Sequence, residues 1–482
     1  MALFFQRDAT LQVYPNKSDG TFPSGSKAFA IPMLEGFSFS QSTNSSEITL
    51  SEMESTAGTS RRGRKMFNDS LAPVEWSFST YIRPYIASST AVSGSTISWA
   101  DQQVHLVDEC LWNSLLSKSR IDEDGTSGTS VANLTFSGGS GNQAGDVLTA
   151  TNGTLVTGYS HAQATVVSVS SGVITEVEIT RPGQYSANPT TFTSSRGGAN
   201  VGTVTVVMGE EGDSMIDRGT TKTVMSSKNS NVSALNTMTL EFMIGTGVGY
   251  KLNKAVCNSA TINFDVEGIA TIEWSGMAAT IDGITAFTAA TGANSSNAAI
   301  NEGGTSADTE NFIRNRLTAM SVAPKTSGTS AGVSGMQSSY DLTLTGGSIT
   351  IENNISYLTP EELGVVNKPI EHVTGVRNVG GSFTCYLASN SANNGSKDFF
   401  EDLTSAAALD VITHDFEMIF KIGGSSGTPR IEVKMPQCHV EVPTHSIEDV
   451  ISLESSFTSL QSDMESNIVD DLELSIHGVA LS

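Results

Sequence analysis

Residues 261–275 read Thr-Ile-Asn-Phe-Asp-Val-Glu-Gly-Ile-Ala-Thr-Ile-Glu-Trp-Ser, an alternation of apolar and polar side chains around Gly268. Successive side chains of an extended strand point to opposite faces. One face of each strand is therefore apolar, with Ile262, Phe264, Val266, Ile272 and Trp274. The other face is polar and carries Asp265, Glu267 and Glu273. This pattern predicts a β-hairpin that packs on a core through one face only.

The chain carries this pattern twice, because five short segments recur in the same order. The matched pairs are Arg7–Pro15 with Arg316–Pro324, Ser77–Ile82 with Ser382–Leu387, Leu106–Glu109 with Phe399–Asp402, Phe242–Gly245 with Phe420–Gly423, and Cys257, Glu273 and Ser275 with Cys438, Glu454 and Ser456. The shared order indicates a duplicated unit, interrupted in the first copy by a long additional segment between Phe78 and Phe242. Cys257 and Cys438 are then equivalent, which predicts two buried core positions.

Composition favours an all-β protein with many turns. The chain has 482 residues, 45 glycines, only 16% charged residues and a formal net charge of −24. Such a charge argues against a protein that binds nucleic acid through its phosphates, although simple solubility explains it equally well. Four cysteines without paired spacing predict neither a disulfide framework nor a zinc site. The N-terminus shows no signal peptide and no run long enough for a membrane helix, which predicts a chain used without secretion.

The pattern predicts three domains, two of which are tandem β-sandwich or barrel units with one flanking helix each. The expected boundaries are residues 1–125 plus 215–280 for the first unit, 130–209 for a small inserted all-β domain, 281–308 for a linker, and 309–482 for the second unit. One helix is expected to start at Asp101 and to bury Val104, Val107, Leu111 and Leu115, and the other to follow Ser396.

No catalytic pattern in the sequence is convincing, so we expect no catalytic residue, no metal, no cofactor and no enzymatic activity. Two alternatives are less favoured: a metal at His439 and His445, better explained as surface histidines, and a cation between the acidic segments that flank the insert, better explained as solvated hinge residues. The glycine-rich segment Gly245–Gly249 lacks the spacing of nucleotide-binding loops and is better explained as a β-turn. The single dense basic cluster is Arg61, Arg62, Arg64 and Lys65, in a polar loop between two strands. Nucleic-acid contact is one interpretation; pairing with acidic surface on a neighbouring subunit fits the net charge better.

Three segments together resemble the tail tube proteins of long-tailed, Caudovirales-type bacteriophages: Ser259–Gly276, Leu235–Gly245 and Pro73–Arg83. The resemblance implies a structural virion protein that forms stacked, hexagonally symmetric rings around a conduit for DNA during ejection. Because most members supply one domain per chain, two domains imply homotrimeric rings with pseudo-six-fold symmetry.

The resemblance also implies roles for particular residues. Asp265, Glu267, Glu273 and Glu454 become candidates for facing the lumen, where viral DNA passes without specific binding. Arg61, Arg62, Arg64 and Lys65 match the loop that docks on the adjacent ring, with only Lys368 and Arg377 in the comparable loop of the second copy. Tape-measure and tail-terminator or tip proteins are the expected partners, no membrane is involved, and assembly is expected in the host cytoplasm.

An alternative function is a virion carbohydrate-binding or adhesion protein that acts through the inserted domain, with Tyr159 and Tyr185 stacking on sugar rings. All four tryptophans lie outside the insert, which weakens this alternative. The arrangement of the two units also stays open at this point, because tandem domains either share one ring or stack along the tube axis.

Overall fold

The computed structural model describes residues 5, 8–16, 29–47, 66–86, 104–116, 130–155, 161–181, 183, 185–209, 215–217, 222–226, 235–245, 247–288, 311–325, 337–363, 367–390, 392, 394–407, 415–424, 429–447, 450–461 and 471–480. Strands dominate this part of the chain, which also contains helices α1 (Glu109–Leu116) and α2 (Ser396–Ala407) and a 3-10 turn at Asn315–Leu317. The prediction of an all-β protein with little helix is confirmed.

The first copy is a β-sandwich whose two sheets share one long strand. One sheet has the order β2 (Phe29–Ile31), β1 (Ala9–Pro15), β19 (Met238–Ile244), the first half of β20 (Gly249–Asp265), and β22 (Thr280–Ile284). The other has β3 (Ser38–Ser40), β6 (Val74–Tyr81), β21 (Thr271–Ala278) and the second half of β20. Between the two halves Lys254 adopts a φ of 51°, the kind of local irregularity that lets a strand turn from one packed sheet into the next.

The second copy repeats these pairings. β24 (Tyr340–Leu342), β23 (Ala319–Lys325), β29 (Asp415–Ile422) and β30 (Arg430–Val440) form one sheet. β25 (Leu344–Glu352), β28 (Asn378–Tyr386) and β32 (Ile451–Ser459) belong to the other. The register is also repeated: Val13 lies opposite Leu240 as Val322 lies opposite Met418, and Ser77 opposite Ser275 as Ser382 opposite Ser456.

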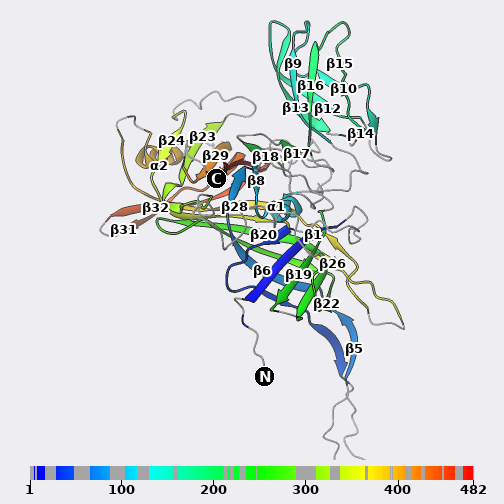
Figure 1. Cartoon of the computed structure of the whole chain (residues 1–482). Helices are drawn as coiled ribbons and strands as arrows, with labels where there is room; N and C mark the ends of the chain where they lie inside the picture. The colour runs from blue at the N-terminus through cyan, green and yellow to red at the C-terminus, as the bar shows by residue number, and fades with distance from the viewer. Residues whose placement is uncertain are drawn as a thin grey trace, which may run out of the picture.

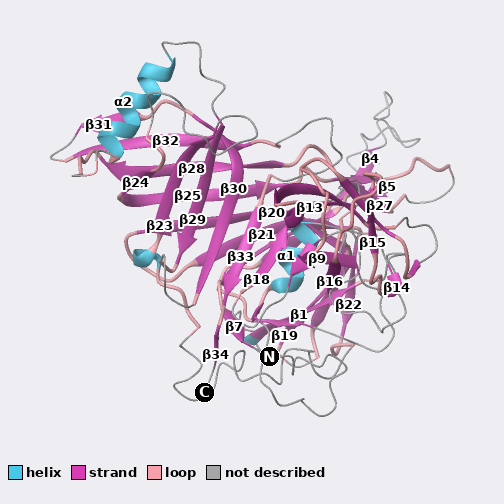
Figure 2. Cartoon of the chain, turned by 90° about the horizontal axis from the view of Figure 1, so that it is seen from above, coloured by secondary structure: helices cyan, strands magenta, loops and turns pink. Residues whose placement is uncertain are grey.

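The two copies are joined edge to edge in a single sheet. The second half of β20 pairs with β25, so that Thr261 lies opposite Thr350, and β31 (Thr444–Ile447) pairs with β32 at the far end. We call this sheet, in the order β3–β6–β21–β20–β25–β28–β32–β31, the shared sheet. One hydrophobic cluster extends through both copies, from Leu11 to Ile476. The two sandwiches therefore have a common core. Figure 2 shows strands of the second copy side by side, with α2 at their edge.

The C-terminal segment returns to the first copy. β33 (Glu473–His477) lies between β30 and β18 (Thr223–Ser226), which in turn pairs with β17 (Met215–Asp217). β34 (Val479–Ala480) pairs in parallel with β7 (Pro84–Ile86), the neighbour of β8 (Val104–Leu106).

The segment inserted in the first copy forms its own β-structure. A four-stranded sheet has the order β13 (Val173–Arg181), β12 (Gln163–Ser170), β10 (Val147–Ala150) and β15 (Phe192–Ser194). Two further pairs are β9 (Ser130–Ser137) with β16 (Thr203–Gly209), and β11 (Thr154–Leu155) with β14 (Tyr185–Ala187). These strands, which we call the insert, bury a separate hydrophobic cluster. In Figure 1 the insert lies at the opposite end of the molecule from β5 (Met66–Leu71).

Two exposed ribbons complete the fold. β4 (Thr43–Glu47) pairs with β5, and β26 (Ser356–Leu358) pairs with β27 (Glu371–Val373). They occupy comparable places along the chain: the first ribbon connects β3 with β6, and the second connects β25 with β28. A bridge between Ser70 and Asn367 connects the neighbouring segments.

The helix of the first copy is shorter than the spacing predicts. Val104 and Leu106 belong to strand β8, and Asp108, whose carbonyl accepts hydrogen bonds from the amides of Leu111 and Trp112, stands just before α1. Pairing with β7 therefore overrides the helical spacing of Val104, and the match of Leu106–Glu109 with Phe399–Asp402 is wrong. Asp101, the expected start, lies outside the described residues. In the second copy α2 begins at Ser396 itself, whose side-chain oxygen accepts a hydrogen bond from the amide of Ala388.

Cys257 and Cys438 are both buried, as expected, but they are not equivalent. Cys438 lies opposite Phe416, whose counterpart in the first copy, Met238, lies opposite Ala255. The turn after β20 accounts for the two-residue difference, because Thr271 follows its partner Asn263 by eight residues, whereas Ser452 follows its partner Ser446 by six. The gapless sequence match between these cysteines is therefore coincidental.

Candidate functional site

One face of the shared sheet is polar across both copies. Residues that lie directly opposite one another share a face, and the registers connect rows of polar side chains from β6 to β32. One row runs Ser79, Glu273, Thr261, Thr350, Gly380 and Thr458; the next runs Tyr81, Thr271, Asn263, Ser348, Ser382 and Ser456. We call this surface the polar face.

Every charged side chain that these strand segments place on the polar face is acidic. The carboxylates are Glu75, Asp265, Glu273, Glu352 and Glu454. The segments β3, β6, β21, Ser259–Asp265, β25, β28 and β32 contain neither lysine nor arginine. Like charges without counterions give the face a negative potential within the screening length of about 8–10 Å at ordinary salt.

Hydroxyl groups on the polar face bond to one another across strands. Ser38 and Ser77 are 2.9 Å apart between their side-chain oxygens, Ser259 and Ser275 are 2.8 Å apart, and the Thr261 and Thr350 oxygens are separated by 3.2 Å. The last pair crosses the junction between the two copies. Neighbouring hydroxyls therefore satisfy part of one another's hydrogen-bonding capacity, and the surface presents few strong donors to a passing ligand.

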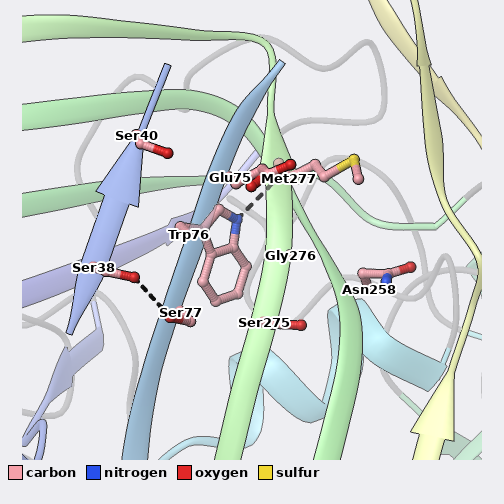
Figure 3. A pocket seen from close by; sticks show the side chains of 9 residues that line it. All are labelled: Ser38, Ser40, Glu75, Trp76, Ser77, Asn258, Ser275, Gly276 and Met277. Carbon is pink, nitrogen blue, oxygen red and sulfur yellow. Dashed lines mark hydrogen bonds between the residues drawn. The ribbon is translucent and has the colours of Figure 1, made fainter. Parts of the chain in front are cut away.

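A shallow hollow of about 270 Å³ opens on this face near β3 (Figure 3). The Trp76 indole below it donates a hydrogen bond of 3.2 Å to the carbonyl of Met277. The hollow is lined by Ser38, Ser40, Glu75, Trp76, Ser77, Asn258, Ser275, Gly276 and Met277. Small hydroxyl side chains predominate, and no group of three or more His, Cys, Asp or Glu able to hold a metal ion occurs among the described residues.

The four acidic residues singled out from the sequence occupy two kinds of position. Glu273 and Glu454 are exposed and equivalent, because they lie opposite Ser79 and Thr384 at matching places in β6 and β28. Asp265 ends β20, and Glu267 lies beyond it in the turn, where its amide donates a hydrogen bond to Asp265 Oδ1. Val266 belongs to the same turn and is 51% exposed, so its assignment to the apolar face is wrong.

The basic cluster Arg61, Arg62, Arg64 and Lys65 lies outside the described residues. The strands on either side, β4 and β5, form the first exposed ribbon, on which Met66 and Phe67 are exposed. Sequence reasoning missed this apolar character, because the charged run dominated the pattern. Lys368, near the second ribbon, is exposed.

Arg377, the other basic residue expected in the docking loop of the second copy, is held inside the chain. It makes two hydrogen bonds of 2.9 Å to the Asp471 carboxylate and one of 3.1 Å from Nη1 to the carbonyl of Leu116, at the end of α1. The guanidinium side chain is only 9% exposed. Its donors therefore connect the two copies to each other and are not available to an acidic surface on a neighbouring subunit.

The insert offers no described aromatic platform for a sugar at the predicted positions. Tyr185 is buried, and its hydroxyl accepts a hydrogen bond of 2.6 Å from the amide of Ala162. Tyr159 lies outside the described residues. The interpretation of Tyr185 as a stacking residue is therefore wrong, because the ring fills the core of the insert.

A duplicated β-sandwich with a common sheet, an acidic hydroxyl-rich face and exposed ribbons fits a structural protein of the tail tube class. Over 440 aligned residues, which cover 90% of this chain and 68% of the relative, the chain is 24% identical to the tail tube protein pb6 of Escherichia phage T5. No protein-family model matches the chain. The similarity to pb6 confirms the resemblance to phage tail tube proteins and supports a structural role in the virion tail. No helix among the described residues is long and apolar enough to cross a membrane.

Proposed function

We propose that the chain builds a non-enzymatic phage tail tube from stacked rings of three copies, each ring presenting six pseudo-equivalent sandwiches around a DNA channel. The observation that carries this proposal is the pairing of β20 with β25. It places the two copies side by side in one sheet, with equivalent strands repeating along it. A stack of the two domains along the tube axis would not bring these strand edges together.

The polar face is the proposed wall of the channel. Its carboxylates carry the same sign as DNA phosphates, and the strand segments that form it contain no lysine or arginine to bind them. Repulsion over about 8–10 Å is short-ranged, so it acts as a property of the wall and leaves the ring contacts unaffected. Asp265, Glu273 and Glu454 are the proposed lumen residues, with Glu267 at the rim.

The two ribbons are the proposed contacts between rings. Exposed apolar side chains gather on them and beside them, including Met66, Phe67, Leu358, Ile370 and Val373. Such exposed side chains mark contact surfaces in soluble proteins. Arg61, Arg62, Arg64 and Lys65 would add charge complementarity at the tip of the first ribbon. The insert, 130–209, faces outward in this proposal, and tape-measure and terminator or tip proteins act at the ends of the tube.

Electron microscopy of the purified chain at high concentration tests the proposal directly. We expect rings or hollow tubes whose cross-sections show three outer lobes, one per insert, around an open channel. Six equal outer lobes, or two tandem layers per chain along the axis, would contradict the trimeric ring. Monomers that persist even with preformed tube ends as initiators would contradict the tube itself.

A further inference from the structure

The pairing of the two copies within one chain is a template for the contact between two chains. In the shared sheet, the second half of β20 from the first copy pairs with β25 of the second. The counterpart of β25 in the first copy is β3, at one end of the sheet, and the counterpart of the β20 half in the second copy is β31, at the other end. Among the described strands, β3 pairs only with β6, and β31 only with β32.

The equivalence of β31 with the second half of β20 follows from their registers. Thr261 lies opposite Glu273, and Thr444 lies opposite Glu454, which is the counterpart of Glu273. By the same reasoning Ser446 corresponds to Asn263. In the second copy Glu441–Pro443 separates β31 from β30, whereas β20 is continuous.

The equivalence of β3 with β25 follows in the same way. Ser38 lies opposite Ser77, and Ser348 lies opposite Ser382, the counterpart of Ser77. Ser40 therefore corresponds to Thr350, and Phe39 to Ile349.

Combining the two equivalences, we infer that β31 of one chain pairs antiparallel with β3 of the next, with Thr444 opposite Ser40 and Ser446 opposite Ser38. These pairs repeat Thr261 with Thr350 and Asn263 with Ser348 inside the chain. The inference rests on the proposed ring and specifies its subunit contact, because three head-to-tail contacts of this kind close the polar face into a continuous wall.

The exposure of β31 supports a covering partner. All four of its residues are exposed, and Ile447 is 79% exposed. Its counterpart Phe264, in contrast, is 4% exposed because the second copy covers it. An exposed edge strand with apolar side chains is a ready template for pairing with another chain.

Side-chain sizes differ between the two junctions. At the internal junction Phe264 lies opposite Gly347, where an added Cβ would come within 2.9 Å of the Phe264 ring. At the inferred contact, the register continued by one residue places the smaller Ile447 opposite Phe37 of the neighbouring copy. The larger side chain of the opposed pair is therefore Phe264, on β20, at the internal junction, and Phe37, just before β3, at the inferred contact.

Disulfide trapping tests this register in the full-length chain. Thr444→Cys combined with Ser40→Cys is expected to give covalent oligomers that stop at three chains on non-reducing gels after assembly and mild oxidation. Directly opposite residues have Cβ atoms about 4.5–5.5 Å apart, whereas diagonal neighbours are about 7–8 Å apart. Thr444→Cys with Ser38→Cys, a diagonal pair, should therefore cross-link several-fold less. All four natural cysteines are buried, which keeps the background low.

Thr261→Cys with Thr350→Cys is the matched control, because it has the same geometry inside one chain and should oxidise without forming oligomers. One outcome would overturn the inferred register while the proposed function stands: rings form by electron microscopy, but Thr444→Cys with Ser40→Cys cross-links no better than the diagonal pair. Covalent dimers as the end point would overturn the head-to-tail contact. A chain that forms no rings under any condition would overturn both.

Discussion

Arg377 and Asp471 form a bidentate ion pair that connects three parts of the chain: the start of β28, the C-terminal segment and the end of α1. Both side chains are under 10% exposed. Removing one member leaves the other charge buried without its partner, which costs about 3–5 kcal/mol. We expect Arg377→Ala to lower the free energy of unfolding by about this amount in urea titrations.

Lys368→Ala is the matched control for Arg377→Ala, because Lys368 is exposed and such substitutions stay within about 0.5 kcal/mol. An apolar double variant, Arg377→Met with Asp471→Leu, should recover part of the lost stability, since no unpaired charge remains. A loss of only about 0.5 kcal/mol in Arg377→Ala would show that the pair is effectively solvated.

Asp108 is a second buried charge with consequences for stability. It accepts a hydrogen bond of 3.0 Å from Thr80, which itself accepts one from the Trp274 indole, but Oδ1 has no hydrogen-bond partner among the described residues. Burial raises the pKa of this carboxyl from 3.8 to about 7. The folded chain therefore holds this proton more tightly than the unfolded chain does.

The sign of the resulting pH dependence is set by that raised pKa. The contribution of protonated Asp108 is complete below about pH 4 and is lost as the pH rises to about 7, a change of up to about 4 kcal/mol. Asp108→Asn should remove this part of the profile, so that its stability relative to the parent rises between pH 4 and 7. Urea titrations of the unassembled chain across this range measure it. Glu454→Gln controls for removing an exposed carboxylate, and identical profiles for Asp108→Asn and the parent would refute the effect.

At the scale of elements, the insert is expected to be separable from the sandwiches. Its hydrophobic cluster, which includes Leu148, Ile174 and Tyr185, has no member in common with the cluster of the two copies. Replacing residues 130–209 with a short Gly-Ser linker should therefore leave the thermal unfolding of the remainder unchanged and the rings intact. Circular dichroism melting and electron microscopy measure both.

A matched deletion tests whether separability is specific to the insert. Removing residues 473–482 takes away β33, which pairs with strands of both copies and buries Leu474 and Ile476. Loss of each buried side chain of this size costs about 2–5 kcal/mol, so this truncation should abolish cooperative unfolding. If the insert deletion were equally damaging, the insert would be part of the main fold.

The elements also show which features the sequence could predict. Alternation in Thr261–Asp265 and in Thr271–Ser275 predicted strands and faces correctly, because one face is buried and the other is not. Repeated segments predicted the duplicated pairings. Local pattern failed where tertiary pairing decides. Val104 has helical spacing but pairs with β7, and the gapless match of Cys257 with Cys438 hides the longer turn after β20. The edge-to-edge pairing of β20 with β25 connects residues far apart in sequence, so no local sequence pattern predicts it.

The candidate site was predictable in part for the same reason. Glu273 and Glu454 fall at equivalent exposed positions because the alternation that places them is local. Arg377 was misassigned because its position in a loop suggested a free cation, whereas its partner Asp471 lies in the C-terminal segment. A sequence shows the sign of each charged side chain. Whether that side chain forms an ion pair within the fold depends on contacts between distant segments.

At the scale of the whole molecule, the proposed channel wall predicts where added cations will bind DNA. The double variant Glu273→Lys with Glu454→Lys places new cations on the polar face, next to the hydroxyl ladders, in both copies of every chain. Contacts of lysine with phosphate release counterions, so the resulting affinity should fall steeply with salt. Assembled tubes of this variant are expected to retain short duplex DNA at low salt in sedimentation assays.

A control variant with the same charge change on another surface tests whether the polar face lines an enclosed channel. Glu401→Lys puts a cation on the exposed surface of α2, beside Lys397, away from the polar face. If the polar face lines an enclosed channel, DNA retained by the Glu273→Lys, Glu454→Lys tubes should be protected from nuclease, whereas any DNA bound by Glu401→Lys tubes should be digested. The neutral variant Glu273→Gln with Glu454→Gln should bind neither more nor less than the parent, because loss of repulsion alone supplies no phosphate ligand. Equal nuclease sensitivity in both lysine variants would place the polar face on the outside of the tube, and the proposed wall would have to be sought on another sheet.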